Sequence, residues 1–170
     1  MSENSIRDQL AYSKEQGALL FNSVRYMLIR PETIIGFQKA IEREIGDKCG
    51  DMLYAGGFEG GSLSAKKYRE LYHYSDKEII NFMITMGSEI GWGKFRLEQY
   101  DHDAHILIVS IENSPFAEAY GRADVPVCHL LRGVLGGMAN AIFGNAGICI
   151  EKNCAAMGND RCVFHYLSEK

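Results

Sequence analysis

Three cysteines and one glutamate in the last third of this 170-residue chain are the side chains best suited to chemistry: Cys128, Glu151, Cys154 and Cys162. Glu151 and Cys154 are close together where a predicted strand enters a loop. The turn at residues 157–160 folds that loop back, so Cys154 and Cys162 can converge on one ion. Cys128 lies near the start of the preceding helix, and the antiparallel return from that helix can bring its thiol beside the loop. We therefore expect one metal site.

Three thiolates and one carboxylate can fill the tetrahedral shell of Zn²⁺. Thiolates are soft ligands, which disfavours calcium and magnesium, and a filled shell predicts a structural ion rather than a catalytic one. Cys149 could replace Glu151, since the two share a strand face, and four cysteines would suit an iron–sulfur cluster. Spacing alone leaves both fourth ligands open, and it also allows that the cysteines are small buried hydrophobic residues.

A second group of residues could line an apolar ligand pocket: Phe82, Met86, Trp92, Phe95 and Tyr120. Methionine and aromatic side chains adapt to irregular apolar ligands. The alternative for each of them is ordinary core packing.

The remaining patterns exclude several classes of function. The net charge is −4 without a basic block, which does not support nucleic-acid binding. The glycine-rich residues 54–63 lack the motifs of phosphate and dinucleotide loops. Residues 101–105, DHDAH, fall where a hairpin turn is expected, and no catalytic motif was found, so the sequence favours a binding protein over an enzyme. The polar N-terminus and the lack of a long apolar stretch indicate a cytoplasmic protein.

The elements that must position these residues form an α/β mixture. Helices are expected from Pro31 to Gly46, over 48–71 with glycine interruptions, from the N-cap Ser75, at 114–115 and over 125–143, with a short opening helix around 6–12. Strands are expected over 18–21, 24–29, 95–100, 105–111, 148–152 and 162–167. Short hairpin links favour an antiparallel sheet of about four or more strands packed against helices.

Three runs of sequence resemble the 4-vinyl reductase domain, the hydrocarbon-binding module of phenol- and xylene-responsive activators. They are IENSPFAEAYG from Ile111, PVCHLLRGVLGGMANAIFG from Pro126 and IEKNCAAMGNDRCVFH from Ile150. In aromatic-sensing members, zinc is held by a Cys before a helix, by Glu-x-x-Cys and by a Cys eight residues on. The resemblance therefore implies zinc at Cys128, Glu151, Cys154 and Cys162, and it favours Glu151 over Cys149.

The resemblance also implies a single domain over residues 1–170, with its zinc segment at 126–167. The fold is shared with subunits of a Golgi transport particle, and it implies a homodimer with an apolar pocket between helices and sheet. A His and a Trp take the phenol hydroxyl in aromatic sensors, and Trp92 and His105 are candidates for these roles by residue type alone. We expect a zinc-stapled sensor of a small hydrophobic ligand, whose state a partner protein reads. The alternatives are a role in reducing a vinyl group of a tetrapyrrole and a scaffold filled by an acyl chain.

Overall fold

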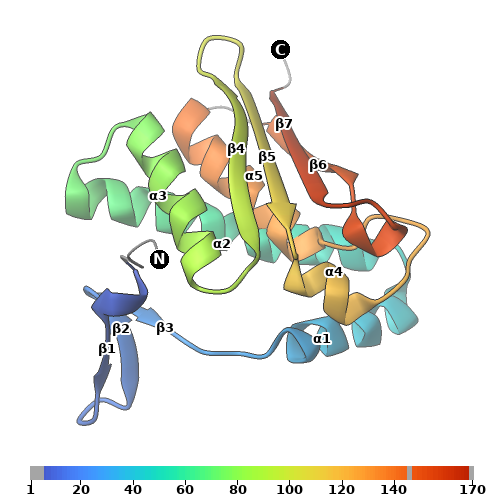
Figure 1. Cartoon of the computed structure of the whole chain (residues 1–170), viewed down its shortest axis with the longest axis horizontal. Helices are drawn as coiled ribbons and strands as arrows, with labels where there is room; N and C mark the ends of the chain where they lie inside the picture. The colour runs from blue at the N-terminus through green and yellow to red at the C-terminus, as the bar shows by residue number, and fades with distance from the viewer. Residues whose placement is uncertain (1–5, 145–146, 169–170) are drawn as a thin grey trace.

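The main sheet has four antiparallel strands in the order β4-β5-β7-β6 (Figure 1). A computed structural model describes residues 6–144 and 147–168 of the chain. The strands are β4 (Lys94–Asp101), β5 (Ile106–Glu112), β6 (Gly147–Asn153) and β7 (Cys162–Ser168). Both hairpins, β4-β5 and β6-β7, pair antiparallel, as does the junction of β5 with β7. The expected antiparallel sheet covered by helices is confirmed.

Five helices accompany this sheet: α1 (Pro31–Ile45), α2 (Lys48–Tyr72), α3 (Asp76–Glu89), α4 (Pro115–Tyr120) and α5 (His129–Phe143). α5 packs against β6 and β7, α3 packs against β4, and α2 lies along α5. Ser75 and Glu78 form the expected capping box of α3. Among the described residues, no helix combines the length and the apolar character that crossing a bilayer requires.

The contact between α2 and α5 depends on glycines. A Cβ atom on Gly57 would lie 2.1 Å from the Leu130 carbonyl oxygen, and one on Gly137 would lie 1.9 Å from the Phe58 oxygen. Neither helix backbone could come so close to the other if these positions carried side chains. The glycines of α2 were expected to interrupt the helix, but α2 runs unbroken through them, because two of the four, Gly57 and Gly61, are used for close packing.

A second, smaller sheet precedes the helices and lies apart from the main sheet in Figure 1. Its strands are β1 (Leu10–Ser13), β2 (Ala18–Phe21) and β3 (Val24–Tyr26), paired antiparallel in that order. An extended connection, residues 27–30, leads from β3 to α1. Phe21 anchors this sheet, since it is 1% exposed and packs edge-on against Tyr68 of α2.

Three expected boundaries were wrong. The opening helix is one 3-10 turn, Arg7–Gln9, followed at once by β1, because residues 10–13 pair with β2. β3 ends at Tyr26, where its pairing with β2 ends. α5 begins at His129 rather than at residue 125, because Cys128 has a non-helical backbone and forms the N-cap.

The glycine contact makes a testable prediction. Gly137→Ala should destabilise the fold by about 3 kcal/mol or more, because its Cβ meets the backbone of α2 and the helices must separate. Gly36→Ala in α1 is the matched control, since nothing lies within 4 Å of its Cβ position, and it should be neutral or stabilise by up to about 1 kcal/mol. Urea unfolding of both variants measures the difference. Equal free energies of unfolding for the two variants would contradict the packing described.

Candidate functional site

Cys128, Glu151, Cys154 and Cys162 come together in one buried cluster. Their candidate ligand atoms all lie within 4.8 Å of one another, and the side chains are 5% exposed or less. Cys128 caps α5, Glu151 belongs to β6, Cys154 follows β6, and Cys162 begins β7. The Sγ atoms of Cys128 and Cys162 are 3.8 Å apart. The cluster therefore joins the start of the long helix to the β6-β7 hairpin.

Backbone groups hold the four side chains in place. The Cys128 N–H donates to Oε2 of Glu151 at 3.0 Å, and the Ala155 N–H donates to Sγ of Cys162 at 3.3 Å. The Cys154 N–H donates to Oδ1 of Asn159 at 3.2 Å, which ties the loop to itself. Gly158 has a φ of 93°, a conformation that glycine adopts at little cost. The turn expected from the sequence thus returns the chain so that Cys162 meets Cys154.

Burial and mutual repulsion govern the charge of the cluster. Burial raises the pKa of Glu151 to about 8, and the neighbouring Cys154 thiolate adds to the shift. Hydrogen bonds from the thiols of Cys128 and Cys162 lower the pKa of Cys154, and the hydrogen bond with Cys154 raises that of Cys128. One thiolate is thus favoured over the others when no cation is bound. A divalent cation would allow several of these groups to ionise together.

The donor set fits a soft divalent metal ion. Oε1 of Glu151 is buried and has no hydrogen-bond partner within the described part of the chain, although buried carboxylate oxygens are normally satisfied. A cation among the thiols would satisfy it. Cys149 is not in this cluster, since its Cβ lies 3.3 Å from the Cβ position of Gly136 on α5. The geometry therefore groups Glu151, rather than Cys149, with the other three cysteines.

An apolar cavity of about 120 Å³ lies between α3, α5 and β4. Met86, Trp92 and Phe95, three of the six pocket candidates, line it. The other lining residues are Tyr26, Ser64, Met83, Ile84, Gly87, Ile90, Leu131, Val134, Leu135 and Met138. We refer to this space as the inner cavity.

A larger groove of about 350 Å³ adjoins the inner cavity. Tyr26, Ile90 and Trp92 line both spaces and therefore form the wall between them. The connection at residues 27–29 forms part of the groove. A ligand could approach the inner cavity from this side.

The other three pocket candidates lie elsewhere. Phe82 packs among tyrosines at the end of α2 and in the turn that follows. His105 is at the β4-β5 turn, with its ring centroid 5.3 Å from that of Phe143. Tyr120 belongs to α4, and its hydroxyl donates to the carboxylate of Glu42 at 3.0 Å. The structure therefore gives these three residues no place around the inner cavity.

Sequence reasoning missed the contribution of α5 to the cavity. Leu131, Leu135 and Met138 are spaced four and three residues apart, so they share one helix face. That periodicity could have found them. Tyr26 had no such signal, because its position depends on how the small sheet sits against α2 and α3.

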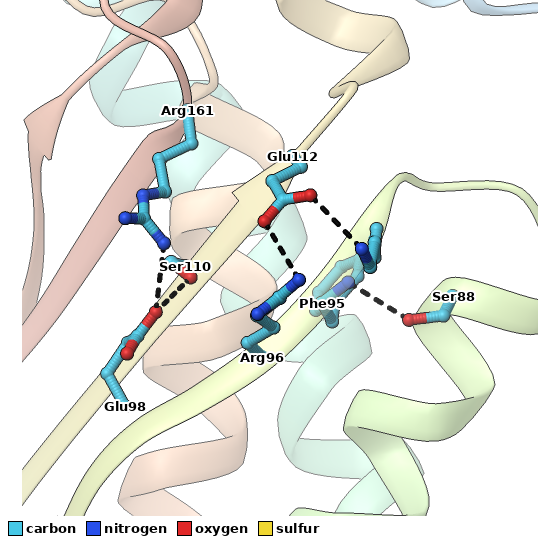
Figure 2. A network of polar contacts seen from close by, with 8 residues as sticks. Ser88, Phe95, Arg96, Glu98, Ser110, Glu112 and Arg161 are labelled. Carbon is cyan, nitrogen blue, oxygen red and sulfur yellow. Dashed lines mark hydrogen bonds and ion pairs between the residues drawn. The ribbon is translucent and has the colours of Figure 1, made fainter.

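Polar contacts outside the cavity fix its β4 wall (Figure 2). The Phe95 N–H donates to Oγ of Ser88 at 3.0 Å, which joins β4 to the end of α3. In Figure 2, Arg161 and Ser110 both point to the carboxylate of Glu98, and the Arg161–Glu98 contact is 3.5 Å. Because Arg161 precedes Cys162, this contact also connects β4 to the metal cluster's hairpin.

Comparisons with known proteins agree with this architecture. Residues 107–167 match the model of the 4-vinyl reductase domain family, and the match includes all four residues of the metal cluster. Among curated proteins, no sequence relative matches.

Several solved structures share the fold at low sequence identity. The phenol-responsive sensory domain of the transcription activator PoxR, solved with phenol, has a TM-score of 0.81 at 17% identity, covering 95% of this chain and 86% of that one. A vinyl-4-reductase family protein from Methanocaldococcus jannaschii has a TM-score of 0.59 at 17% identity, with 85% of each chain covered.

A trafficking protein particle complex subunit 3 from Naegleria fowleri, covalently bound to palmitic acid, also has a TM-score of 0.59. It is 10% identical and covers 82% of this chain and 95% of its own. The resemblance inferred from the sequence is confirmed: this chain carries a match to the 4-vinyl reductase domain, within the mixed α/β fold that PoxR and the transport-particle subunit share.

Proposed function

We propose that residues 1–170 form one zinc-stapled domain that senses a small hydrophobic molecule. One observation carries the proposal: α5 begins in the Cys₃Glu cluster and continues as a wall of the inner cavity. Cys128 caps this helix, and Leu131 follows it by less than one turn. A metal ion at the cluster would therefore hold the cavity wall against the β6-β7 hairpin.

The size of the inner cavity supports a ligand of about one ring. An engineered apolar cavity of about 150 Å³ is known to bind benzene, and the inner cavity measures about 120 Å³. The PoxR domain was solved with phenol, a ligand of this size. A sixteen-carbon acyl chain is much larger than the inner cavity, which disfavours the scaffold alternative.

Zinc is the ion that this donor set favours. Thiolate ligands select against magnesium and calcium, and three sulfurs with one oxygen suit a closed tetrahedral site. The four residues would hold the ion without an open position, so its role is structural. Ligand binding in the inner cavity would change the packing of α5, and a partner protein would read the population of the bound state.

Vinyl-group reduction is the second candidate, because the structure from Methanocaldococcus jannaschii is described as a vinyl-4-reductase family protein. The sequence carries no motif for a nicotinamide or flavin that would supply the hydride. A tetrapyrrole is also too large for the inner cavity. Turnover of a vinyl tetrapyrrole with a reductant would favour this candidate over ligand sensing.

The zinc proposal is tested by replacing ligands. Cys154→Ser and Cys162→Ser should each lose stoichiometric zinc and lower the melting temperature by about 10 °C or more, because binding energy at a structural zinc site is folding energy. Cys149→Ser is the matched control, since Cys149 is equally buried yet outside the cluster, and it should keep its zinc. Elemental analysis and thermal unfolding measure both effects. Zinc retained in both ligand variants, or lacking in the wild type, would refute the proposal.

The cavity proposal is tested by filling the space. Toluene should raise the melting temperature of the wild type in a saturable way, as any ligand of the native state does. Val134→Phe places a ring in the lining of the inner cavity and should abolish that rise. Val125→Phe makes the same change at a residue that is 61% exposed and should leave it intact. Toluene binding that survives in Val134→Phe would exclude the inner cavity as its site.

We also propose a cytoplasmic homodimer. Free thiols are typical of reducing compartments. More than half of the large apolar side chains with high exposure fall within residues 27–63, which supports an interface there. On one face of α2, Met52 and Leu63 are 61% and 63% exposed and flank Gly56 and Gly60. This order is symmetric about residue 58, so two antiparallel copies of α2 would bury it.

Leu63→Glu should convert the dimer to a monomer, because a charge would be buried against the partner's Met52. Val125→Glu introduces the same charge at a similarly exposed position outside the proposed interface and should leave the dimer unchanged. Sedimentation velocity measures the masses of the wild type and both variants. A wild type that sediments as a monomer at tens of micromolar would overturn the dimer without affecting the ligand proposal.

A further inference from the structure

Two tyrosine hydroxyls meet at the edge of the inner cavity. Tyr26, the last residue of β3, and Tyr68 of α2 are hydrogen-bonded through their hydroxyl groups. Tyr68 is fully buried, and Tyr26 is partly buried and lines the inner cavity. The Tyr26 hydroxyl also lies 3.2 Å from the sulfur of Met86, another lining residue.

These groups leave one hydrogen poorly satisfied. Two hydroxyls carry two hydrogens, and the bond between them uses one. If Tyr68 donates to Tyr26, the Tyr26 hydrogen has the thioether of Met86 as its partner, and thioether sulfur is a weak acceptor. If Tyr26 donates instead, no other hydrogen bond of the Tyr68 hydroxyl is found among residues 6–144 and 147–168. Burial raises the pKa of both tyrosines, so both remain protonated donors.

We propose that the ligand of the inner cavity carries a hydrogen-bond acceptor, and that the Tyr26 hydroxyl donates to it. This inference rests on the proposed function, whose site it shares. A buried hydroxyl without a good acceptor is unfavourable, and an acceptor oxygen in the cavity would replace the sulfur. The ligand class is a ring-sized apolar molecule with one ketone, ether or hydroxyl oxygen, rather than a plain hydrocarbon.

The rest of the lining agrees with a single polar end. Apart from Tyr26, the hydroxyl side chain of the lining is Ser64, and no charged residue takes part. Met83, Leu135 and Met138 are typical of the apolar remainder. Such a cavity binds most of the ligand through the hydrophobic effect, and a polar contact then orients it. Because Tyr26 also lines the outer groove, the polar end would lie near the entrance.

The test compares two ligands of equal shape, cyclohexanone and cyclohexane, which differ in one acceptor oxygen. Dissociation constants are measured by NMR titration of the intact protein for the wild type, Tyr26→Phe, Tyr68→Phe and Tyr74→Phe. Tyr26→Phe should weaken cyclohexanone by about fivefold and leave cyclohexane unchanged. Tyr68→Phe keeps the Tyr26 donor and should preserve cyclohexanone binding. Tyr74→Phe removes a hydroxyl outside the cavity lining and should change neither ligand.

The outcomes separate this inference from the function on which it rests. If Tyr26→Phe weakens both ligands alike, or neither, Tyr26 is only structural and the inference fails while ligand binding stands. Cyclohexane binding without cyclohexanone binding has the same meaning. If the wild type binds neither compound, both the inference and the ring-sized ligand site fail. Should Tyr26→Phe not fold, loss of cyclohexanone binding in Tyr68→Phe would overturn the inference, and its retention would support it.

Discussion

Four ionisable side chains share one buried space where α5 meets the β6-β7 hairpin, and the rest of the C-terminal half is arranged around them. Their ligand atoms lie within 4.8 Å of one another, a separation at which several negative charges cannot coexist in a low-dielectric interior without a cation. The hairpin has little other reason to return so tightly. The start of α5, the turn at Gly158 and the register of β7 all meet at this point.

The glycine contact between α2 and α5 complements this constraint. The cluster fixes the start of α5, and Gly133 and Gly137 let its middle lie directly on the backbone of α2. The side of α5 that bears Leu131, Leu135 and Met138 remains for the inner cavity. One helix thus has three neighbours, the metal cluster, α2 and the cavity, and a displacement at any one of them must affect the others.

Much of this could be predicted from the sequence where the determinants are local. The capping box of Ser75 and Glu78, the proline at the start of α1 and the glycine that ends it predicted those helix ends correctly. The four residues of the metal cluster were also identified beforehand, because ligand type and spacing are local and a family pattern matched them. The choice between Cys149 and Glu151 needed coordinates, since both side chains are buried and two residues apart on one strand.

The pocket was predicted less well, because its walls come from distant parts of the chain. Phe82, His105 and Tyr120 are aromatic like Trp92 and Phe95, and composition cannot tell which of them face the same space. Tyr26 lines the inner cavity only because a strand near the N-terminus packs against α2 and α3. Likewise, the glycines of α2 predicted a broken helix, since their partners on α5 lie more than seventy residues away.

The division of the cavity wall has a consequence for how such a domain could diversify. The α5 side of the inner cavity cannot change freely, because that helix also caps the metal cluster and lies on α2. The opposite side, formed by Met83, Ile84 and Met86 of α3 and by Phe95 of β4, carries neither duty. Substitutions there could reshape the pocket for new compounds while leaving the scaffold intact, which makes α3 and β4 the natural place to redesign selectivity.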